Sequence, residues 1–346
     1  MNEKELLKKL CESHGPSGRE HWLFDTIKCA FENYGEVTKD NLNNVIIKKK
    51  GKGKGKIMLM AHADEIFMVV TKIDKNGFLQ FEENGFDPKV LVSQEVIIHG
   101  KEKILGIIGV KPPHLFNDED RKKAIKVEDL RIDTGYSEEL LREKISVGDF
   151  VTIKRNFIEL LNDNVSGKAL DDRACIGILY SCAKELENIN HDLDVYFVCS
   201  SQEEVGHRGA KTATYGIKPD IGIAIDVGFD NSFLGDEDSN TALGDGPMIS
   251  VGPNIHPKLR RYTIDIAKEY NIPYGVEVCP GATGTDAWDI QISADGVPTL
   301  LFSLAQRYMH TSVEVVNIND IKNAGRLLAK VIEKTKYEDL EGILCF

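Results

Sequence analysis

Short apolar strands alternate with helical segments over most of this 346-residue chain, and this alternation limits its possible folds more than any other feature. Two amphipathic helices are predicted within residues 3–34. Strands at 44–47 and 57–60 follow, joined by a Lys/Gly-rich run. This run could bind an anion, but we expect a solvated hairpin tip. Later helices are predicted at 173–187, 256–270 and 318–334, and later strands at 195–199, 221–226, 275–278 and 299–303. The pattern is typical of an α/β protein with a mixed open sheet layered by helices.

The stretch from residue 70 to residue 157 interrupts this alternation. Its only sustained helical pattern is at 137–144. The β-like segments are short and separated by glycines and polar residues: 90–98, 104–110 and 149–153. We therefore predict an inserted β-rich domain at 70–157, small and barrel-like, within a discontinuous α/β domain made of residues 1–69 and 158–346.

Charge and hydropathy restrict the partners of the chain. The net charge of -12 argues against non-specific binding to nucleic acid, which needs a basic surface. The sequence has no apolar run of membrane-spanning length and no signal-peptide pattern at Met1, so we expect no membrane partner and a cytoplasmic location. Its seven cysteines form no CxxC pair, which indicates reduced and mostly buried thiols.

His62 and Asp64 are the first candidate site residues along the chain. They follow the predicted strand at 57–60, and the carboxyl ends of strands are where sites assemble in open α/β sheets. Residues two apart in extended chain point to the same side, so Asp64 could accept an imidazole N–H and orient His62 for metal binding. A purely structural His–Asp pair would explain the same pattern.

Asp171 and Asp172 precede the helix predicted at 173–187. Helix capping is the simplest interpretation of acids at this position. A cap needs only one of them, however. Asp171 could therefore bridge two cations while Asp172 caps the helix or pairs with Arg173.

Glu203 and Glu204 follow the strongly apolar strand at 195–199. Two adjacent carboxylates without a flanking lysine repel each other unless a cation lies between them or one is protonated. This favours a functional site over a solvated loop. One carboxylate could bind metal while the other accepts a proton from water.

Asp226 and His310 each follow an apolar strand. Taken singly, each could equally be a structural residue of the sheet or the core. The full set of candidates has two histidines, two aspartates and a glutamate as ligands, with no cysteine. Such a set suits Zn or Co, and its share of carboxylates leaves Mn open.

The chain resembles the M42 metallo-aminopeptidases, a family that includes TET-type and glutamyl aminopeptidases and relatives described as cellulase M. The resemblance covers nearly the whole chain, and its segments occur in the order of the family. These are AHADE at 61–65, ALDDRACIG at 169–177, SSQEEVGHRGA at 200–210, AIDVG at 224–228, GTDA at 284–287 and RYMHT at 307–311.

The resemblance implies a metal-dependent aminopeptidase with a zinc-aminopeptidase-like fold, acting on peptides with a free N-terminus. Two divalent ions per subunit would activate a water molecule for hydrolysis. Glu203 would be the general base, and Asp64 would support catalysis beside His62. The implied ligands are His62 and Asp226 for one ion, Glu204 and His310 for the other, and Asp171 for both.

The resemblance further implies that the inserted domain mediates dimerisation, and that dimers assemble into a hollow dodecamer. His207 departs from the family, in which an aliphatic residue is common, and it could therefore alter the pocket, although we expect a surface histidine. His114 is expected in a loop or an interface, and Asp286 either supports the site or serves a turn or helix cap.

Two other functions compete with an aminopeptidase. An endoglucanase-type glycoside hydrolase would need only two carboxylates, which leaves His62 and His310 without a role. A non-catalytic metal-binding scaffold would use the same ligands. Chelator-sensitive cleavage of an aminoacyl anilide would reject both.

Overall fold

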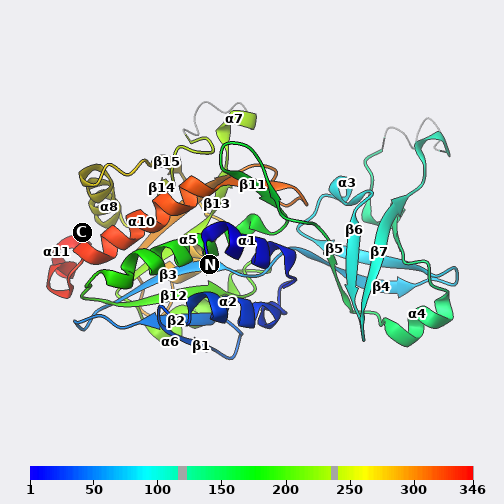
Figure 1. The fold of residues 1–346 in the computed structure, drawn as a ribbon, viewed down its shortest axis with the longest axis horizontal. Helices are drawn as coiled ribbons and strands as arrows, with labels where there is room; N and C mark the ends of the chain where they lie inside the picture. The colour runs from blue at the N-terminus through cyan, green and yellow to red at the C-terminus, as the bar shows by residue number, and fades with distance from the viewer. Residues whose placement is uncertain (116–122, 235–240, 346) are drawn as a thin grey trace. The chain divides into compact units, whose positions relative to one another are not determined.

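The computed structural model describes residues 1–115, 123–234 and 241–345, and the chain forms two compact units (Figure 1). The first unit comprises residues 1–65, 157–309 and 313–346. The second comprises residues 66–156 together with 310–312. Each unit has its own hydrophobic core.

The first unit is built on an eight-stranded mixed sheet with the order β1-β2-β12-β3-β13-β16-β14-β15. The four central strands, β12, β3, β13 and β16, are parallel to one another. The strands are β1 Glu36–Lys39, β2 Val45–Lys49, β3 Lys56–His62, β12 Asp194–Ser200, β13 Ile221–Phe229, β14 Met248–Val251, β15 Gly275–Val278 and β16 Thr299–Gln306. The prediction of a mixed open sheet is confirmed.

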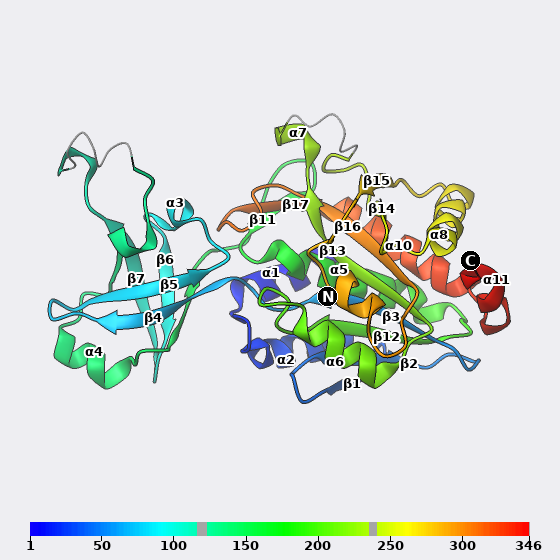
Figure 2. The same ribbon diagram turned by 180° about the vertical axis from the view of Figure 1, so that it is seen from behind.

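Helices cover both faces of this sheet, which explains why its central strands are almost continuously apolar. Figure 1 shows α1, α5 and α10 in front of the sheet, and Figure 2, the view from behind, shows α6 on the opposite face. Helix α9 packs against β13 and α6. The main helices are α1 Glu3–Glu12, α2 Phe24–Phe31, α5 Leu170–Glu185, α6 Arg208–Ile217, α8 Pro257–Glu269, α9 Ala287–Gln291 and α10 Ile318–Lys334.

The predicted hairpin between β2 and β3 is wrong, because β12 lies between these two strands. The Lys/Gly-rich run therefore crosses the end of β12 instead of forming a tight turn. Within it, Gly53 donates its N–H to the carbonyl of Asp192, and Gly51 donates to the Asp194 carboxylate. Local turn chemistry could not reveal a strand that comes from a distant part of the chain.

The second unit is a closed barrel with the strand order β4-β5-β8-β7-β6-β9, as the sequence predicted for the inserted domain. Side chains alternate along its strands, so Ile104 and Ile108 of β7 point into the core while Leu105 and Ile107 point outward. The strands are β4 Phe67–Ile73, β5 Phe78–Asn84, β6 Glu95–His99, β7 Lys103–Val110, β8 Leu130–Asp133 and β9 Phe150–Ile153. A short helix, α4, spans Glu138–Lys144.

One barrel segment differs from its prediction. Residues 90–98 were expected to form one strand, but α3 (Pro88–Leu91) occupies the start of this stretch and β6 begins only at Glu95. Asp87 caps α3 by accepting the N–H of Lys89, and Pro88 stands in the first helical turn. This Asp-Pro start favours a helix over a strand.

No helix in the described ranges is both long and apolar enough to cross a lipid bilayer.

Candidate metal centre

The carboxyl ends of the parallel strands bring several candidate residues of the first unit together. His62 is the last residue of β3 and lies opposite Ser200, the last residue of β12. Asp226 stands near the end of the neighbouring strand β13. The loop after β12 carries Glu203 and Glu204. This is the edge at which sites form in open α/β sheets.

Two overlapping groups of potential ligand atoms share His62. In the first, His62, Asp171 and Glu204 offer atoms within 4.8 Å of one another. In the second, His62, Asp172 and Asp226 do the same. All of these residues are buried except Glu204, which is half-buried. Their imidazole and carboxylate donors fit divalent ions such as Zn, Co or Mn.

Both aspartates at the start of α5 direct a carboxylate oxygen to His62, which the simplest interpretation of the sequence, helix capping, does not include. The helix begins after Ala169, which makes no side-chain cap, and the backbone at Asp171 and Asp172 is not helical. Asp171 Oδ1 instead lies 3.1 Å from His62 Nε2. Asp172 Oδ2 accepts the backbone N–H of His62 at 3.0 Å, and its Oδ1 is buried without a hydrogen-bond partner. That unpaired oxygen suits a cation.

Asp64 ties the end of β3 to the loop that carries the two glutamates. Its carboxylate accepts the backbone N–H groups of Glu203 at 3.1 Å and Glu204 at 3.2 Å, and the hydroxyl of Ser17 at 2.6 Å. Asp64 Oδ1 also lies 3.5 Å from His62 Nδ1. Burial opposes its ionisation, but the hydrogen bond and charge of His62 outweigh burial and lower the pKa of Asp64.

The concentration of buried acids changes their ionisation. Burial and the charge of Asp172 raise the pKa of Asp226 well above its usual range, and burial does the same for Asp172. Burial opposes protonation of His62, but the acceptors Asp171 and Asp64 outweigh it and raise the pKa of His62. Several buried carboxylates this close together repel one another when ionised, and a bound cation would offset that repulsion. The residues therefore fit a divalent metal centre.

His207 is not the surface histidine that we expected. Its Nε2 lies 3.2 Å from Glu203 Oε1, and its Nδ1 lies 3.3 Å from Asp289 Oδ2. Only 21% of its side chain is exposed. The hydrogen bond with Glu203 is the main cause that raises the pKa of His207 to about 9. The spacing of four residues between Glu203 and His207 could have indicated this contact.

Two further buried carboxylates, those of Asp286 and Glu20, contact residues close to Glu203 in the sequence. Asp286 accepts the hydroxyl of Ser200 and makes no helix cap, so its alternative role as a cap is excluded. Burial and the charge of Glu203 raise the pKa of Asp286 to about 7. Glu20, which the sequence analysis missed, is buried and accepts the backbone N–H of Gln202 at 3.0 Å. Nothing in the local sequence around Glu20 indicates this distant contact.

A buried ionic group lies beside the centre. Glu65 binds Lys168 with one carboxylate oxygen and Arg173 with the other, the latter at 3.0 Å. Arg173 also donates to the carbonyls of Leu10 and Ser13, so the group joins the N-terminal segment to the end of β3. Burial opposes ionisation, yet the two cations lower the pKa of Glu65 to about 2.

His310 belongs to the second unit by its contacts. There its Nδ1 lies 2.9 Å from the carbonyl oxygen of Gly85. Among the described residues, neither group of potential ligand atoms includes His310.

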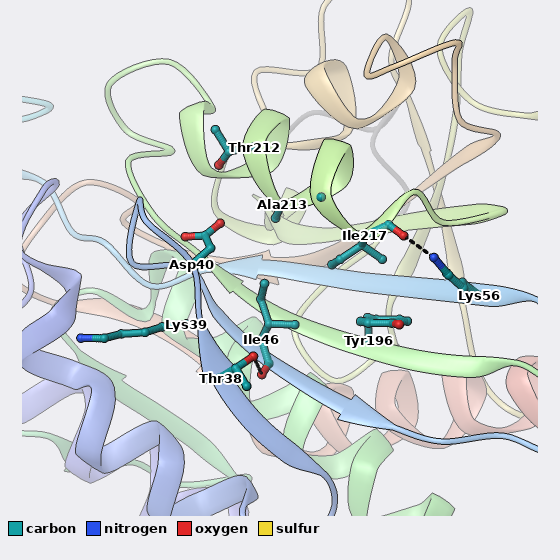
Figure 3. Close-up of a pocket in the computed structure, with 10 residues that line it drawn as sticks. Thr38, Lys39, Asp40, Ile46, Lys56, Tyr196, Thr212, Ala213 and Ile217 are labelled. Carbon is teal, nitrogen blue, oxygen red and sulfur yellow. Dashed lines mark hydrogen bonds between the residues drawn. The ribbon is translucent and has the colours of Figure 1, made fainter.

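A separate cavity of about 420 Å³ lies between α6 and the strands β1, β2 and β12 (Figure 3). Lys56 crosses its edge and donates from Nζ to the carbonyl of Ile217 at 2.7 Å. Asp40, Tyr196 and Thr212 also line it. None of the candidate metal ligands does.

Comparisons with a family profile and with known proteins point to the same family. The profile of the M42 glutamyl aminopeptidase family matches residues 43–327. A lysyl aminopeptidase from Pyrococcus furiosus is 37% identical over 349 residues, which cover 98% of this chain and 99% of that protein.

Solved structures agree over the full length. The TET aminopeptidase from a marine sediment archaeon of the Thaumarchaeota superposes with a TM-score of 0.93 at 32% identity, covering 99% of both chains. The Pyrococcus horikoshii TET1 peptidase, which can assemble into a tetrahedron or a large octahedral shell, superposes with a TM-score of 0.85 at 30% identity. This superposition covers 96% of the present chain and 100% of the TET1 chain. The chain therefore belongs to the M42 family and is an aminopeptidase, a hydrolase of peptide bonds.

Proposed function

We propose that this aminopeptidase removes N-terminal residues from peptides with two divalent ions, which when bound would polarise the scissile carbonyl and acidify water. The observation that carries the proposal is the pair of ligand groups that overlap at His62, with Glu203 Oε2 3.8 Å from His62 Nε2. A second carboxylate this close to the ligands, but outside both groups, is suited to proton transfer.

The ligands divide by their surroundings. Asp171 and Glu204 share one group with His62, and Asp172 and Asp226 share the other. We assign Asp171 as the ligand common to both ions because its Oδ1 lies against His62, while one oxygen of Asp172 is committed to the His62 backbone. His310 is proposed as the remaining ligand on the RYMHT segment alone.

Glu203 is the proposed general base. Its backbone N–H is held by Asp64, which fixes the position of the residue, and among the described residues Glu203 belongs to neither group of potential ligand atoms. It accepts a proton from the attacking water and returns that proton to the leaving amine. The donor set favours Zn or Co, with Mn as a third candidate.

The barrel is proposed to mediate self-association. Leu105 and Ile107 stand outward on β7 and are 50% and 54% exposed. Neighbouring outward aliphatic side chains on one strand indicate a contact surface. We propose dimers formed through this unit and, as in TET relatives, a larger assembly such as a dodecamer.

The proposed activity is tested with aminoacyl p-nitroanilides and carboxymethylcellulose in parallel, with and without a chelator. We expect release of nitroaniline that stops on chelation and returns with Zn or Co. Chelator-insensitive release, or hydrolysis of the polysaccharide alone, would reject the metal-dependent aminopeptidase.

A further inference from the structure

Four consecutive backbone N–H groups of the loop after β12, those of residues 201–204, each donate to a buried side chain from an earlier part of the chain. Asn44 Oδ1 accepts the first at 2.8 Å, and Glu20 Oε1 accepts the second at 3.0 Å. The two oxygens of Asp64 accept the third and fourth at 3.1 and 3.2 Å. The loop that carries both candidate glutamates is therefore held at successive backbone atoms by three separate segments.

Gln202 is the residue at which this loop turns. Its φ of 55° lies in the left-handed region, which is disfavoured for a residue with a Cβ atom. Its N–H belongs to the planar peptide group between Ser201 and Gln202, and rotation of that group would change this φ directly. Disfavoured backbone conformations persist where surrounding contacts determine them. By accepting this N–H, Glu20 fixes the peptide group on which the turn depends.

Glu20 is itself held in place. Its side chain is buried, and its Oε1 also accepts the N–H of Gly18 at 2.7 Å. Ser17, in the same segment, donates its hydroxyl to the Asp64 carboxylate at 2.6 Å. The other oxygen of Glu20, Oε2, is buried without a hydrogen-bond partner. A single anchored oxygen therefore accepts both backbone N–H groups.

We propose that Glu20 is a positioning residue, which aims the carboxylates of Glu203 and Glu204 by holding the backbone just before them. This inference rests on the proposed function, in which Glu203 is the general base and Glu204 is a metal ligand. Both residues follow directly after Gln202, so a rotated peptide group there would redirect both side chains. Residues that orient metal ligands in this indirect way contribute to metal affinity and activity without touching the metal.

Two substitutions of Glu20 separate its hydrogen bonds from its charge. Burial and the charge of Asp64 raise the pKa of Glu20 to about 7, so the side chain is only partly ionised near neutral pH. Glu20→Gln keeps an accepting oxygen for the two N–H groups and removes the charge. Glu20→Leu removes the acceptor and keeps a side chain of similar size in the buried space.

The test measures kcat and KM at saturating Zn, with the aminoacyl p-nitroanilide that the wild type cleaves best. Zn affinity is measured separately by competition with a chelator, in the full-length protein. Glu20→Leu should lower kcat by about 10- to 100-fold and weaken the binding of at least one Zn ion by a similar factor. Its KM should change less than about threefold, because the redirected base affects proton transfer. Glu20→Gln should stay within about threefold of the wild type in kcat and Zn affinity.

Asp320 provides a matched control. It is a buried carboxylate at the start of α10 that accepts two backbone N–H groups, from Gly244 at 2.7 Å and Gly246 at 2.8 Å. Asp320→Leu removes the same kind of contact from a different loop, so kcat and Zn affinity should stay within about threefold of the wild type. Circular dichroism and urea unfolding show whether each variant has folded. Where a leucine variant does not fold, alanine, which cannot overpack the site, replaces it with the same expectation.

The inference about Glu20 would be overturned by any of three results. These are a folded Glu20→Leu with kcat near that of the wild type, a Glu20→Gln as impaired as Glu20→Leu, and an Asp320→Leu that loses as much as Glu20→Leu. In each case the aminopeptidase proposal stands. If the Zn-loaded wild type cleaves no anilide, the proposed function fails, and the Zn affinities alone then decide whether Glu20 positions Glu204.

Discussion

The Nε2 atom of His207 lies 3.2 Å from Oε1 of Glu203. On its other side, the same imidazole ring lies 3.3 Å from a carboxylate oxygen of Asp289. The proposed base is thus restrained by a ring that is itself anchored to α9. A restrained carboxylate loses less conformational freedom when it reaches the geometry for proton transfer.

Replacing His207 with leucine should lower kcat about tenfold while KM and metal content stay nearly constant. The reason is that the Glu203 carboxylate would lose its restraint but not its backbone anchor on Asp64. Steady-state kinetics with metal analysis checks this. His207→Gln, which retains an N–H donor, should recover part of the loss. Unchanged kcat in His207→Leu would contradict the positioning role.

Glu203 and Glu204 should respond differently to the same conservative change. Glu203→Gln should retain metal and lose about 10²- to 10⁴-fold in kcat, because proton transfer is removed. Glu204→Gln should lose metal, because it removes a ligand atom of the first group. Each variant serves as the control for the other in metal analysis and kinetics. Substantial turnover by metal-replete Glu203→Gln would reject the assignment of the base.

Glu65→Gln should destabilise the fold by about 3–5 kcal/mol at neutral pH, because Lys168 and Arg173 would remain buried without their carboxylate. Urea unfolding measures this change. Glu269→Gln is the control: it breaks an exposed pair with Lys334 and should cost less than about 1 kcal/mol. A loss for Glu65→Gln no larger than that of the control would contradict a structural role for the ionic group.

The same residue predicts a pH dependence. The pKa of Glu65 falls from 4.5 to about 2 on folding, so its ionised form contributes stability that is complete above about pH 4.5. That contribution declines as pH falls toward 2. Between about pH 4.5 and pH 3, the stability gap between wild type and Glu65→Gln should narrow by about 2 kcal/mol. A gap that stays constant over this interval would show that Glu65 does not titrate as proposed.

Charged substitutions on β7 should disrupt the proposed self-association. Leu105→Asp combined with Ile107→Asp places charge on outward positions and leaves the buried Ile104 and Ile108 in the barrel core. Light scattering after size-exclusion chromatography should report smaller particles with unchanged secondary structure. An unchanged particle mass would exclude this strand from the contact surface.

Much of the fold follows from local patterns. Apolar strands alternating with amphipathic helices predicted the mixed sheet, and the change of texture after residue 70 predicted the barrel. The strand order was less accessible, because β12 enters between β2 and β3 from more than a hundred residues further along the chain. Helix α3 was missed because its Asp-Pro start lies within an otherwise β-like stretch.

The candidate site, like the fold, was predictable where it depends on local patterns and not where it depends on contacts between distant residues. Acids and histidines at strand ends could be expected to meet, since parallel strands end at one edge of the sheet. The roles of Asp286 and Glu20 depend on contacts with Ser200 and Gln202, which are far away in sequence. The capping interpretation of Asp171 and Asp172 missed that both side chains contact His62, a residue more than a hundred positions earlier in the chain, which side-chain propensities alone do not reveal.

The Asp64 carboxylate binds the loop after β12 through the backbone N–H groups of Glu203 and Glu204. This contact does not use the side chains of the two glutamates. These two hydrogen bonds would thus persist with any residue except proline at positions 203 and 204, because proline has no backbone N–H. Single substitutions at these two positions can therefore change metal preference or reactivity during evolution without changing the backbone that holds the site. In protein engineering, positions 203 and 204 are therefore suitable for introducing other metal-binding or proton-accepting side chains.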